Sequence, residues 1–592
     1  MIPLEYQPGI VKVDSAYSQP GRFIDGNNVR FVRNRAEKMK GFERLGEELM
    51  YGVCRAIHAW DDGAQSSYIA AGTNRKLYVA DADGVLTDIT PIRDSGTLTD
   101  PFETTDGSSE VLVHDDAHGA QPGDTVIFSN AEEAVGGLTI DGSYLIEQVL
   151  DANTYTIDAG SPATSSATGG GSVDYEYEVV GGNLNVVRGG GFGVGRFGEG
   201  TFGTERVTGS FLQFAHIWAL KNYGNFLIGQ SHGGSLYYWD PNGAPRAAKI
   251  ANSPEPNLYM FVTDTRHVIV LGAGGDPMKI QWPDQNDFTD WEPTDANDAN
   301  SRVLQNGSRL IAGTQLTNTL NLIWSDTALY RAQYTGSEFV FDTAVIGDQC
   351  GLFGPNAFVT VSGMAFWMSG QDFHAYSGGG VTSIPNAEDV RQWVFELINR
   401  NPQNWKATCG YNPRFNEVWW HFVPEGELEP THYVAVNVQN WTWVHGERTR
   451  TALTTQESLD QRPLGAAPVG DEQSRLYVHE TGLDADGEPM PWHLEYAPFD
   501  IAGGDQTLDL CGFIPDFERQ AGTVDLTITT HDYPADEHPL ETEQTEIPVK
   551  TGMVDIWIGG RQVGFRMSGN ALGSDFRLGK PRVEVKGAGL RR

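Results

Sequence analysis

Short apolar runs separated by polar turns recur along the middle of the chain. One copy of the pattern occupies residues 267–272 and continues at 279–282, and a second copy occupies 320–324 and 329–331. Runs of β-branched, aromatic and leucine residues bounded by Gly, Asn and Asp predict strands joined by tight turns. The pattern therefore predicts an array of antiparallel hairpins.

An apolar residue in the second strand of each hairpin gives the array a period. Seven positions share this place in the pattern: Leu77, Leu236, Ile280, Leu329, Phe373, Val434 and Leu476. From Leu236 onward these residues stand 44, 49, 44, 61 and 42 residues apart. Periods of about 40–50 residues built from short strands are typical of β-propeller blades, each of which buries its faces against its neighbours. We therefore expect an all-β chain with a propeller of six or seven blades.

Two intervals are longer than one blade. The 61-residue interval contains residues 386–400, where Asn386 is a candidate helix N-cap, acids follow in the first turn, and apolar residues then recur at helical spacing. The interval from Leu77 to Leu236 is 159 residues long, roughly 115 more than a blade needs. Strand-like runs and polar turns fill residues 97–190. We expect an inserted small β-barrel or sandwich there.

The composition is that of a globular chain. Hydrophobic residues make up 39% and aromatic residues 11% of the 592 residues, enough for more than one packed core. No run approaches the roughly 18 consecutive apolar residues of a membrane span, and the first residues lack the basic flank and apolar stretch of a secretion signal. The four cysteines stand far apart without metal-site spacing. We expect them to be buried thiols of a protein that matures in a cytosol.

The formal net charge is −37. This charge argues against ordinary nucleic-acid binding, because such binding depends largely on Lys and Arg at phosphates. An acidic wall can instead keep DNA from sticking while it slides past. Plain solubility is the alternative interpretation.

Several motifs resemble catalytic sites but lack the context that those sites need. Residues 229–233 match the G-x-S-x-G nucleophile elbow, but a strand rather than a helix follows, which favours a hairpin turn. Residues 193–198 match G-x-G-x-x-G without a leading strand or a following helix, which favours a loop. Residues 284–291 keep only the acidic turn and the terminal Trp of a sialidase-like Asp-box.

Two further stretches resemble metal sites. Asp484 to Glu495 has the length of a calcium loop but carries Pro489 where the sharp turn needs Gly. His114 and His118 have an H-x-x-x-H spacing, but a neighbouring Gly and Pro place them in a loop. A turn is favoured over a metal in both places. We therefore expect no catalytic, cofactor-binding or metal-binding residues, no cofactor and no enzymatic activity.

A series of sequence blocks runs in order through nearly the whole chain outside the insert. The blocks lie at residues 21–23, 28–31, 193–204, 264–268, 278–285, 324–330, 365–368, 416–420 and 575–582. In these blocks and in their order, the chain resembles the tail nozzle, or tail-hub, β-propeller virion proteins of short-tailed (podovirus-type) bacteriophages. The insert resembles a small β module found in several tail proteins, around residues 118–126.

The resemblance implies a structural protein of the phage tail. It implies a homo-oligomer, a ring of six copies below the portal and tail adaptor, with the propeller outside and platform strands from both chain ends lining a channel. Phage double-stranded DNA is held and then conducted through this tail tube at ejection, without sequence-specific binding. Tail fibres or spikes and the host cell envelope are further implied partners. The implied location is the virion, after synthesis in the host cytoplasm.

With the platform included, five segments are expected along the chain. They are an N-terminal platform segment at 1–50, a first blade at 51–96, the inserted domain at 97–190, the rest of the propeller at 191–488 and a C-terminal β platform at 489–592.

Basic residues concentrate near both chain ends, in an otherwise acidic chain. They are candidates for an interface between subunits, since they could dock on acidic neighbours. The candidate assembly residues are Arg22, Arg30, Arg33, Arg35, Lys580 and Arg582.

An acid-only stretch at residues 532–546 lies between strand-like runs at 524–528 and 554–558. We expect it to be the tip of a long hairpin in the C-terminal platform, either lining the channel or solvated on the outside. The candidate channel acids are Asp532, Asp536, Glu537, Glu541, Glu543 and Glu546.

Two other classes of function remain open. One is a tail protein that binds a host-surface receptor or glycan, with the exposed turns of the insert as the binding part. The other is a propeller glycosidase or depolymerase, which would need carboxylates about 5–10 Å apart at the propeller axis.

Overall fold

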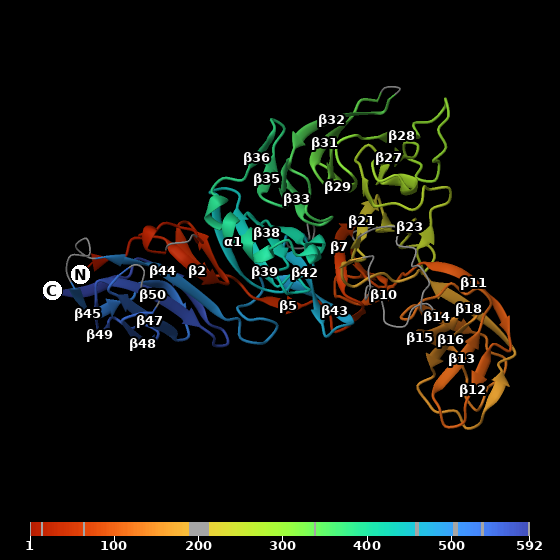
Figure 1. Cartoon of the computed structure of the whole chain (residues 1–592), viewed down its shortest axis with the longest axis horizontal. Coiled ribbons are helices and arrows are strands. Elements are labelled where there is room, and N and C mark those ends of the chain that lie inside the picture. Colours follow the sequence, from red (N-terminus) through yellow and green to blue (C-terminus); the bar gives the residue numbers. More distant parts are fainter. Residues whose placement is uncertain are drawn as a thin grey trace. The chain divides into compact units, whose positions relative to one another are not determined.

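The computed structural model describes residues 2–12, 16–62, 66–188, 212–336, 339–455, 461–500, 507–533 and 538–589. The chain divides into two compact units. One unit comprises Met1–Glu47, Leu304–Val469 and Arg475–Arg592, and the other comprises Glu48–Val303 and Gly470–Ser474. Strands dominate both units, so the chain is all-β, as expected (Figure 1).

Three four-stranded antiparallel sheets lie in the unit that contains residues 48–303. In each sheet every strand pairs with the next one along the chain. The strands are β7 (Cys54–Asp61), β8 (Ser67–Thr73), β9 (Leu77–Ala80) and β10 (Leu86–Asp88); β21 (Trp218–Tyr223), β22 (Phe226–Ser231), β23 (Leu236–Trp239) and β24 (Ala248–Lys249); and β25 (Tyr259–Val262), β26 (Val268–Leu271), β27 (Lys279–Trp282) and β28 (Asn300–Val303).

Four more antiparallel sheets, three of them four-stranded and one five-stranded, lie mainly in the other unit. Three consist of consecutive strands: β29 (Leu310–Gln315), β30 (Leu320–Ser325), β31 (Ala328–Tyr334) and β32 (Phe341–Asp348); β33 (Phe358–Val361), β34 (Met364–Met368), β35 (Phe373–Tyr376) and β36 (Val381–Ser383); and β37 (Thr408–Asn412), β38 (Glu417–Phe422), β39 (His432–Asn437) and β40 (Thr442–Glu447). The fourth contains β41 (Ala452–Thr455), β42 (Pro463–Val469) and β43 (Gln473–His479).

This last sheet is completed by a strand from near the N-terminus. β5 (Phe42–Arg44) pairs antiparallel with the end of β43, with Phe42 opposite His479. The short β6 (Met50–Tyr51) pairs with the beginning of β43, at residues 473–474. Among the described residues, these seven sheets, three in one compact unit and four in the other, have the strand order of propeller blades, which confirms the expected all-β, propeller-type fold class.

All seven residues that set the period lie in the third strand of a blade, and each is at most 3% exposed. The inner strands are apolar on both faces, as in β26, whose four residues are all buried. Strands covered on both faces lose the alternation of a half-exposed sheet, which explains the continuous apolar runs in the sequence. The period found in the sequence is therefore the spacing between the third strands of successive sheets.

One α-helix, α1 (Glu388–Ile398), follows β36, within the expected range 386–400. Asn386 is not its N-cap: Ala387 holds that position, and the amide of Asn386 donates to the carbonyl of Trp441. Short 3₁₀ turns occur at η1 (Ala16–Ser18), η2 (Ala273–Gly275) and η3 (Pro402–Lys406). No helix in the described part of the chain is long and apolar enough to cross a membrane.

The insert is one eight-stranded sheet, ordered β11-β18-β14-β15-β16-β13-β12-β17, around its own apolar core. Its strands are β11 (Ile92–Thr99), β12 (Phe102–Thr104), β13 (Glu110–His114), β14 (Thr125–Ser129), β15 (Gly142–Asp151), β16 (Thr154–Asp158), β17 (Ala167–Gly169) and β18 (Ser172–Glu178). It therefore begins five residues before the expected boundary at 97, and its last strand ends before 190. A small pair, β19 (Val187–Arg188) with β20 (Leu212–Gln213), follows.

The platform consists of three sheets that each combine strands from both ends of the chain. The first sheet contains β1 (Ile2–Pro3), β52 (Arg582–Gly589), β45 (Thr507–Ile514) and β49 (Val554–Gly560). The second contains β2 (Phe23–Asn27), β44 (Trp492–Asp500), β50 (Gln562–Gly569), β47 (Val524–His531) and β48 (Glu541–Ile547). The third contains β3 (Val29–Val32), β4 (Arg35–Lys38), β51 (Asp575–Leu578) and β46 (Phe517–Ala521).

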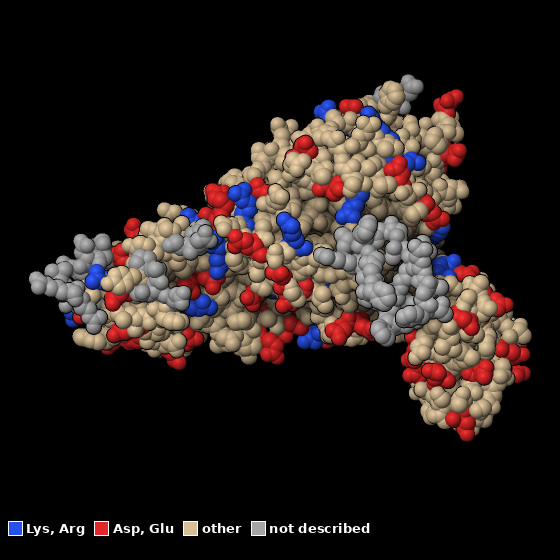
Figure 2. All heavy atoms as spheres, viewed as in Figure 1, with Lys and Arg blue, Asp and Glu red and all other residues tan. Residues whose placement is uncertain are grey.

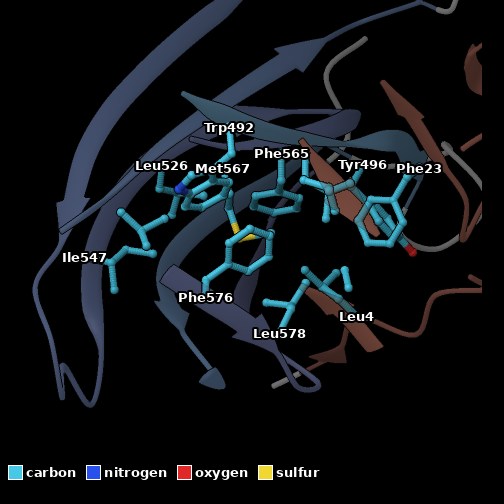
Figure 3. Close-up of a cluster of buried hydrophobic side chains, with 14 of the residues drawn as sticks. Leu4, Phe23, Trp492, Tyr496, Leu526, Ile547, Phe565, Met567, Phe576 and Leu578 are labelled. Atoms are coloured by element: carbon cyan, nitrogen blue, oxygen red, sulfur yellow. The ribbon is translucent and has the colours of Figure 1, made fainter. Parts of the chain in front are cut away.

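A shared apolar core holds the platform sheets together. Figure 3 shows Leu4 and Phe23 from the N-terminal segment beside Phe565, Phe576 and other side chains from the C-terminal strands. The rings of Trp492 and Phe576 stack with 3.9 Å between their centroids. Side chains from both chain ends fill one core, so neither end can form the platform alone.

Candidate assembly surface of the platform

The candidate assembly residues occupy three kinds of environment. Arg22, Arg35 and Lys580 each form an ion pair within the chain. The Arg22 guanidinium lies 2.6 Å from the carboxylate of Asp389 on α1, and Lys580 lies 3.4 Å from Glu5. These contacts supply the acidic partners that the sequence analysis expected from a neighbouring subunit.

Arg30 is buried, which corrects its assignment to a subunit interface. Its guanidinium lies 2.6 Å from Glu480 and 3.1 Å from Glu417, over the ring of Phe415, and the residue is 1% exposed. Burial lowers the pKa of Arg30, but the two carboxylates outweigh burial and hold that pKa above its ordinary value. Charge density along the sequence did not distinguish an interior arginine from a surface one.

Arg33 and Arg582 are exposed and form no ion pair among the described residues. Arg33 lies at the turn between β3 and β4, where it and Asn34 have positive φ angles of 51° and 61°. That geometry matches the tight turn that suits the twist of a two-stranded hairpin. These two arginines remain available to a partner.

The third platform sheet carries a network of alternating charges across its strands. Glu37 on β4 faces Arg577 on β51 at 3.5 Å and Arg519 on β46 at 3.8 Å. Glu518 bridges Arg577 and Arg35, at 3.0 and 3.4 Å. The basic residues of the chain ends are therefore largely neutralised inside one subunit.

The acidic stretch at 532–546 is not a hairpin tip throughout, which corrects the expectation. Glu541, Glu543 and Glu546 lie on β48, which pairs with β47 in register from Val524–Ile547 to Thr530–Glu541. Only Asp532 lies in the described part of the turn, while Asp536 and Glu537 lie outside the described residues. β48 is an edge strand, and edge strands tolerate a charged sequence because only one side of them pairs.

Two of these carboxylates accept hydrogen bonds from the neighbouring edge strand. Glu543 accepts from the backbone N–H of Trp557 at 2.9 Å, and Glu541 accepts from Gly559 at 3.1 Å. The acceptors lie on β48 and the donors on β49, which is the edge of a different sheet. The glutamates therefore occupy N–H groups that another strand could otherwise pair with.

Exposed apolar side chains are concentrated in the same region. Of the fifteen large hydrophobic residues that are exposed in the described part of the chain, five lie between residues 533 and 557: Tyr533, Leu540, Val549, Met553 and Trp557. Trp557 is 76% exposed, whereas Ile556 and Ile558 beside it on β49 are buried. Trp557 was not among the residues predicted from the sequence, although the alternation over residues 554–558 places it on the outer face.

Acidic side chains are spread over the visible surface of both the platform and the insert (Figure 2). On the visible face of the insert they far outnumber Lys and Arg. The acids of the visible face are therefore not confined to one hairpin.

The motifs at residues 229–233, around His118 and around Asp486 take part in turns and contacts of the fold. Ser231 ends β22, and β23 follows after a turn, so residues 229–233 belong to a hairpin. Both ring nitrogens of His118 contact the main chain, at Ala120 and Asp151. Asp486 binds the guanidinium of Arg44 at 2.9 Å. The tract at 193–204 lies outside the described residues. No group of three or more His, Cys, Asp or Glu residues in the described ranges could hold a metal ion.

No protein-family model and no curated protein matches the chain. Among solved structures, the computationally designed Ika8 protein is 11% identical, with a TM-score of 0.32 over 74% of this chain and 100% of that chain. Virginiamycin B lyase from Staphylococcus aureus is 9% identical, with a TM-score of 0.30 over 65% and 98% of the two chains. The endosialidase of phage phi92 is 10% identical, with a TM-score of 0.15 over 76% and 58%. Similarity at these TM-scores carries no argument about function.

Proposed function

We propose that this protein is a structural component of a short-tailed phage tail, in which several copies form a nozzle that holds the phage DNA and conducts it at ejection. One observation carries the proposal: three sheets of the platform combine the first 38 residues with residues 492–589. A platform of this composition beside propeller blades is what the resemblance to tail nozzle proteins implies. The proposed assembly is a homohexameric ring.

The surface of the platform is consistent with this role. Edge strand β48 carries three glutamates, and β49 beside it exposes Trp557. Carboxylates repeated by ring symmetry would raise the negative potential at an opening and favour sliding of DNA over adhesion. The exposed tryptophan supplies apolar area for a contact between protein chains.

The proposed partners follow from the position of a nozzle. They are the portal and tail adaptor above the ring, tail fibres or spikes attached to it, and the host cell envelope at infection. The proposed location is the virion, reached after synthesis in the host cytoplasm.

Negative-stain electron microscopy of the purified full-length chain tests the proposal. A hollow ring with a central opening is the expected image. A single propeller-sized particle at all concentrations, or a trimeric spike, would contradict it. Incubation with capsular polysaccharide is the companion assay, because release of sugar would favour a glycosidase over a structural protein.

A further inference from the structure

A cluster of arginine and histidine side chains is buried where the sheet β37–β40 meets the sheet of β41–β43 and β5. We call it the arginine–histidine cluster: His421 on β38, His479 at the end of β43, and Arg448 and Arg450 between β40 and β41. His421 is 0%, His479 1% and Arg450 3% exposed. All four residues belong to the same compact unit.

The side chains of the cluster contact one another and the same aromatic rings. Arg448 lies over the rings of Trp419 and Tyr433, at 5.3 and 4.9 Å. The imidazole of His421 is 5.5 Å from the ring of Tyr433, its direct cross-strand partner. His421 and Arg448 therefore converge on one tyrosine.

Hydrogen-bond donors outnumber acceptors in the cluster. The imidazole of His479 has Nε2 2.9 Å from Nε of Arg450 and Nδ1 3.2 Å from Nη1 of Arg448. A neutral imidazole has one accepting nitrogen, so one of the two guanidiniums faces an N–H group. Among the described residues, Nη2 of Arg450, Nε of Arg448 and both ring nitrogens of His421 have no hydrogen-bond partner.

Positive charge is also in excess. Glu417 and Glu480 are the carboxylates beside the cluster, and both already bind Arg30. Among the described residues, neither Arg448 nor Arg450 forms an ion pair of its own. Burial, followed by the guanidiniums, holds the pKa of both histidines well below the ordinary value, so the imidazoles are neutral at pH 7. Burial and Arg448 lower the pKa of Arg450 to about 9, so this side chain stays charged at neutral pH.

A buried donor without an acceptor, and a buried charge without a counter-charge, both cost stability. One small anion would meet both needs, because it accepts hydrogen bonds from several directions and carries the missing negative charge. We propose that the arginine–histidine cluster binds a monatomic anion of the chloride type, held by N–H groups of Arg448, Arg450 and His421.

Close packing limits the size of the anion. Arg450 lies 4.3 Å from the ring of Phe42 and 4.9 Å from that of Tyr477. Gly465 packs against Arg450 and His479 from another side. A Cβ atom added to Gly465 would lie only 2.9 Å from Cδ of Arg450 and from Nε2 of His479. Because the side chains around Arg450 and His479 pack this closely, the proposed anion is monatomic rather than a phosphate or a sulfate.

The site would join two elements far apart in the sequence. Phe42 belongs to β5 from the N-terminal region, and its ring lies 5.6 Å from His479. An anion bound here would stabilise the blade that β5 completes against the neighbouring blade. The inference concerns this contact alone and holds whether or not the protein is a tail component.

Chloride-dependent stability of the full-length chain tests the inference. Urea unfolding is followed in sodium chloride and in sodium gluconate at the same ionic strength. We expect the midpoint to rise with chloride and to saturate, because a ligand that binds only the folded state stabilises it by mass action. The variant Arg450→Met should lose this dependence. Arg391→Met on α1, which removes the ion pair of an exposed arginine with Asp372, is the matched control and should keep it.

A second measurement does not require a variant that folds. Crystals grown with bromide should show one anomalous peak among Arg448, Arg450 and His421. Equal midpoints in chloride and gluconate, together with no bromide peak, would show that water alone satisfies these donors and would overturn the inference. An unchanged chloride dependence in Arg450→Met would overturn it as well.

Discussion

Ile92 and Glu178 are direct cross-strand partners, although the whole inserted domain lies between them in the sequence. Partners of this kind have Cα atoms about 5 Å apart. The entry and exit of the insert are therefore adjacent, as in insertions that a host domain tolerates.

Deletion of residues 93–177, with a short Gly/Ser linker in their place, should leave the blades folded. The insert has its own apolar core, and its two ends are close enough for a short bridge. Circular dichroism should show cooperative thermal unfolding of the shortened chain. A broad, non-cooperative transition would show that the blades need the insert to fold.

Glu178 should matter more to stability than any exposed acid of the insert. Its carboxylate is 2% exposed and lies 3.0 Å from Lys76 and 2.8 Å from Arg246, and both cations also bind Asp88. Removal of one partner from a buried ion pair costs about 3 kcal/mol. Glu178→Gln should therefore lower the urea midpoint, while the control Glu176→Gln, at an exposed position two residues away, should not. Equal midpoints for the two variants would refute the ion-pair argument.

Substitutions of Arg30 and Arg33 should affect different properties. Arg30→Met leaves Glu417 and Glu480 buried without their cation, which should cost about 3–5 kcal/mol of unfolding free energy. Arg33→Glu changes an exposed turn and should leave the unfolding curve unchanged, but it should weaken association if that turn contacts another subunit. Unfolding experiments and light scattering separate the two effects. A stable Arg30→Met protein would contradict the burial argument.

Trp557→Ala should weaken association without destabilising the subunit. Exposed side chains usually contribute within about 0.5 kcal/mol to folding, whereas an exposed tryptophan at an interface contributes much of the binding. Phe339, which is 71% exposed on a blade, provides the control Phe339→Ala. Analytical ultracentrifugation should show a smaller assembly only for the Trp557 variant. An unchanged assembly would place the interface elsewhere.

The acidic edge strand allows a test of the channel that leaves its backbone hydrogen bonds intact. Glu546 is exposed and lies opposite Asp525, so Glu546→Lys replaces a like-charge pair with an opposite one. If β48 lines the channel, ejection of DNA from virions carrying Glu546→Lys should slow at low salt and recover as salt screens the new attraction. Asp83→Lys on an exposed blade turn is the control. Equal ejection by both variants at every salt concentration would place β48 outside the channel.

The sequence predicted the parts of the fold that depend on apolar periodicity. Strands covered on both faces require continuous apolar runs, so Leu236, Ile280 and the equivalent residues were found by spacing alone. β48 was missed because an edge strand with Glu, Thr and Gln on it lacks the apolar alternation that identifies a strand. The two partners of Arg30 were missed because Glu417 and Glu480 lie 387 and 450 residues away from it in the sequence. Local sequence patterns do not indicate contacts between residues so far apart in the sequence.

The mixed origin of the platform sheets has a consequence for synthesis. In one of them β1, at residues 2–3, pairs with β52, at residues 582–589, so β1 must wait until β52 has been made. Domains generally fold as units during synthesis, from the N-terminus onward. The blades can therefore form while the chain is growing, but the platform can form only after β52 has been made. A prematurely terminated chain would lack this surface and could not enter an assembly built on it.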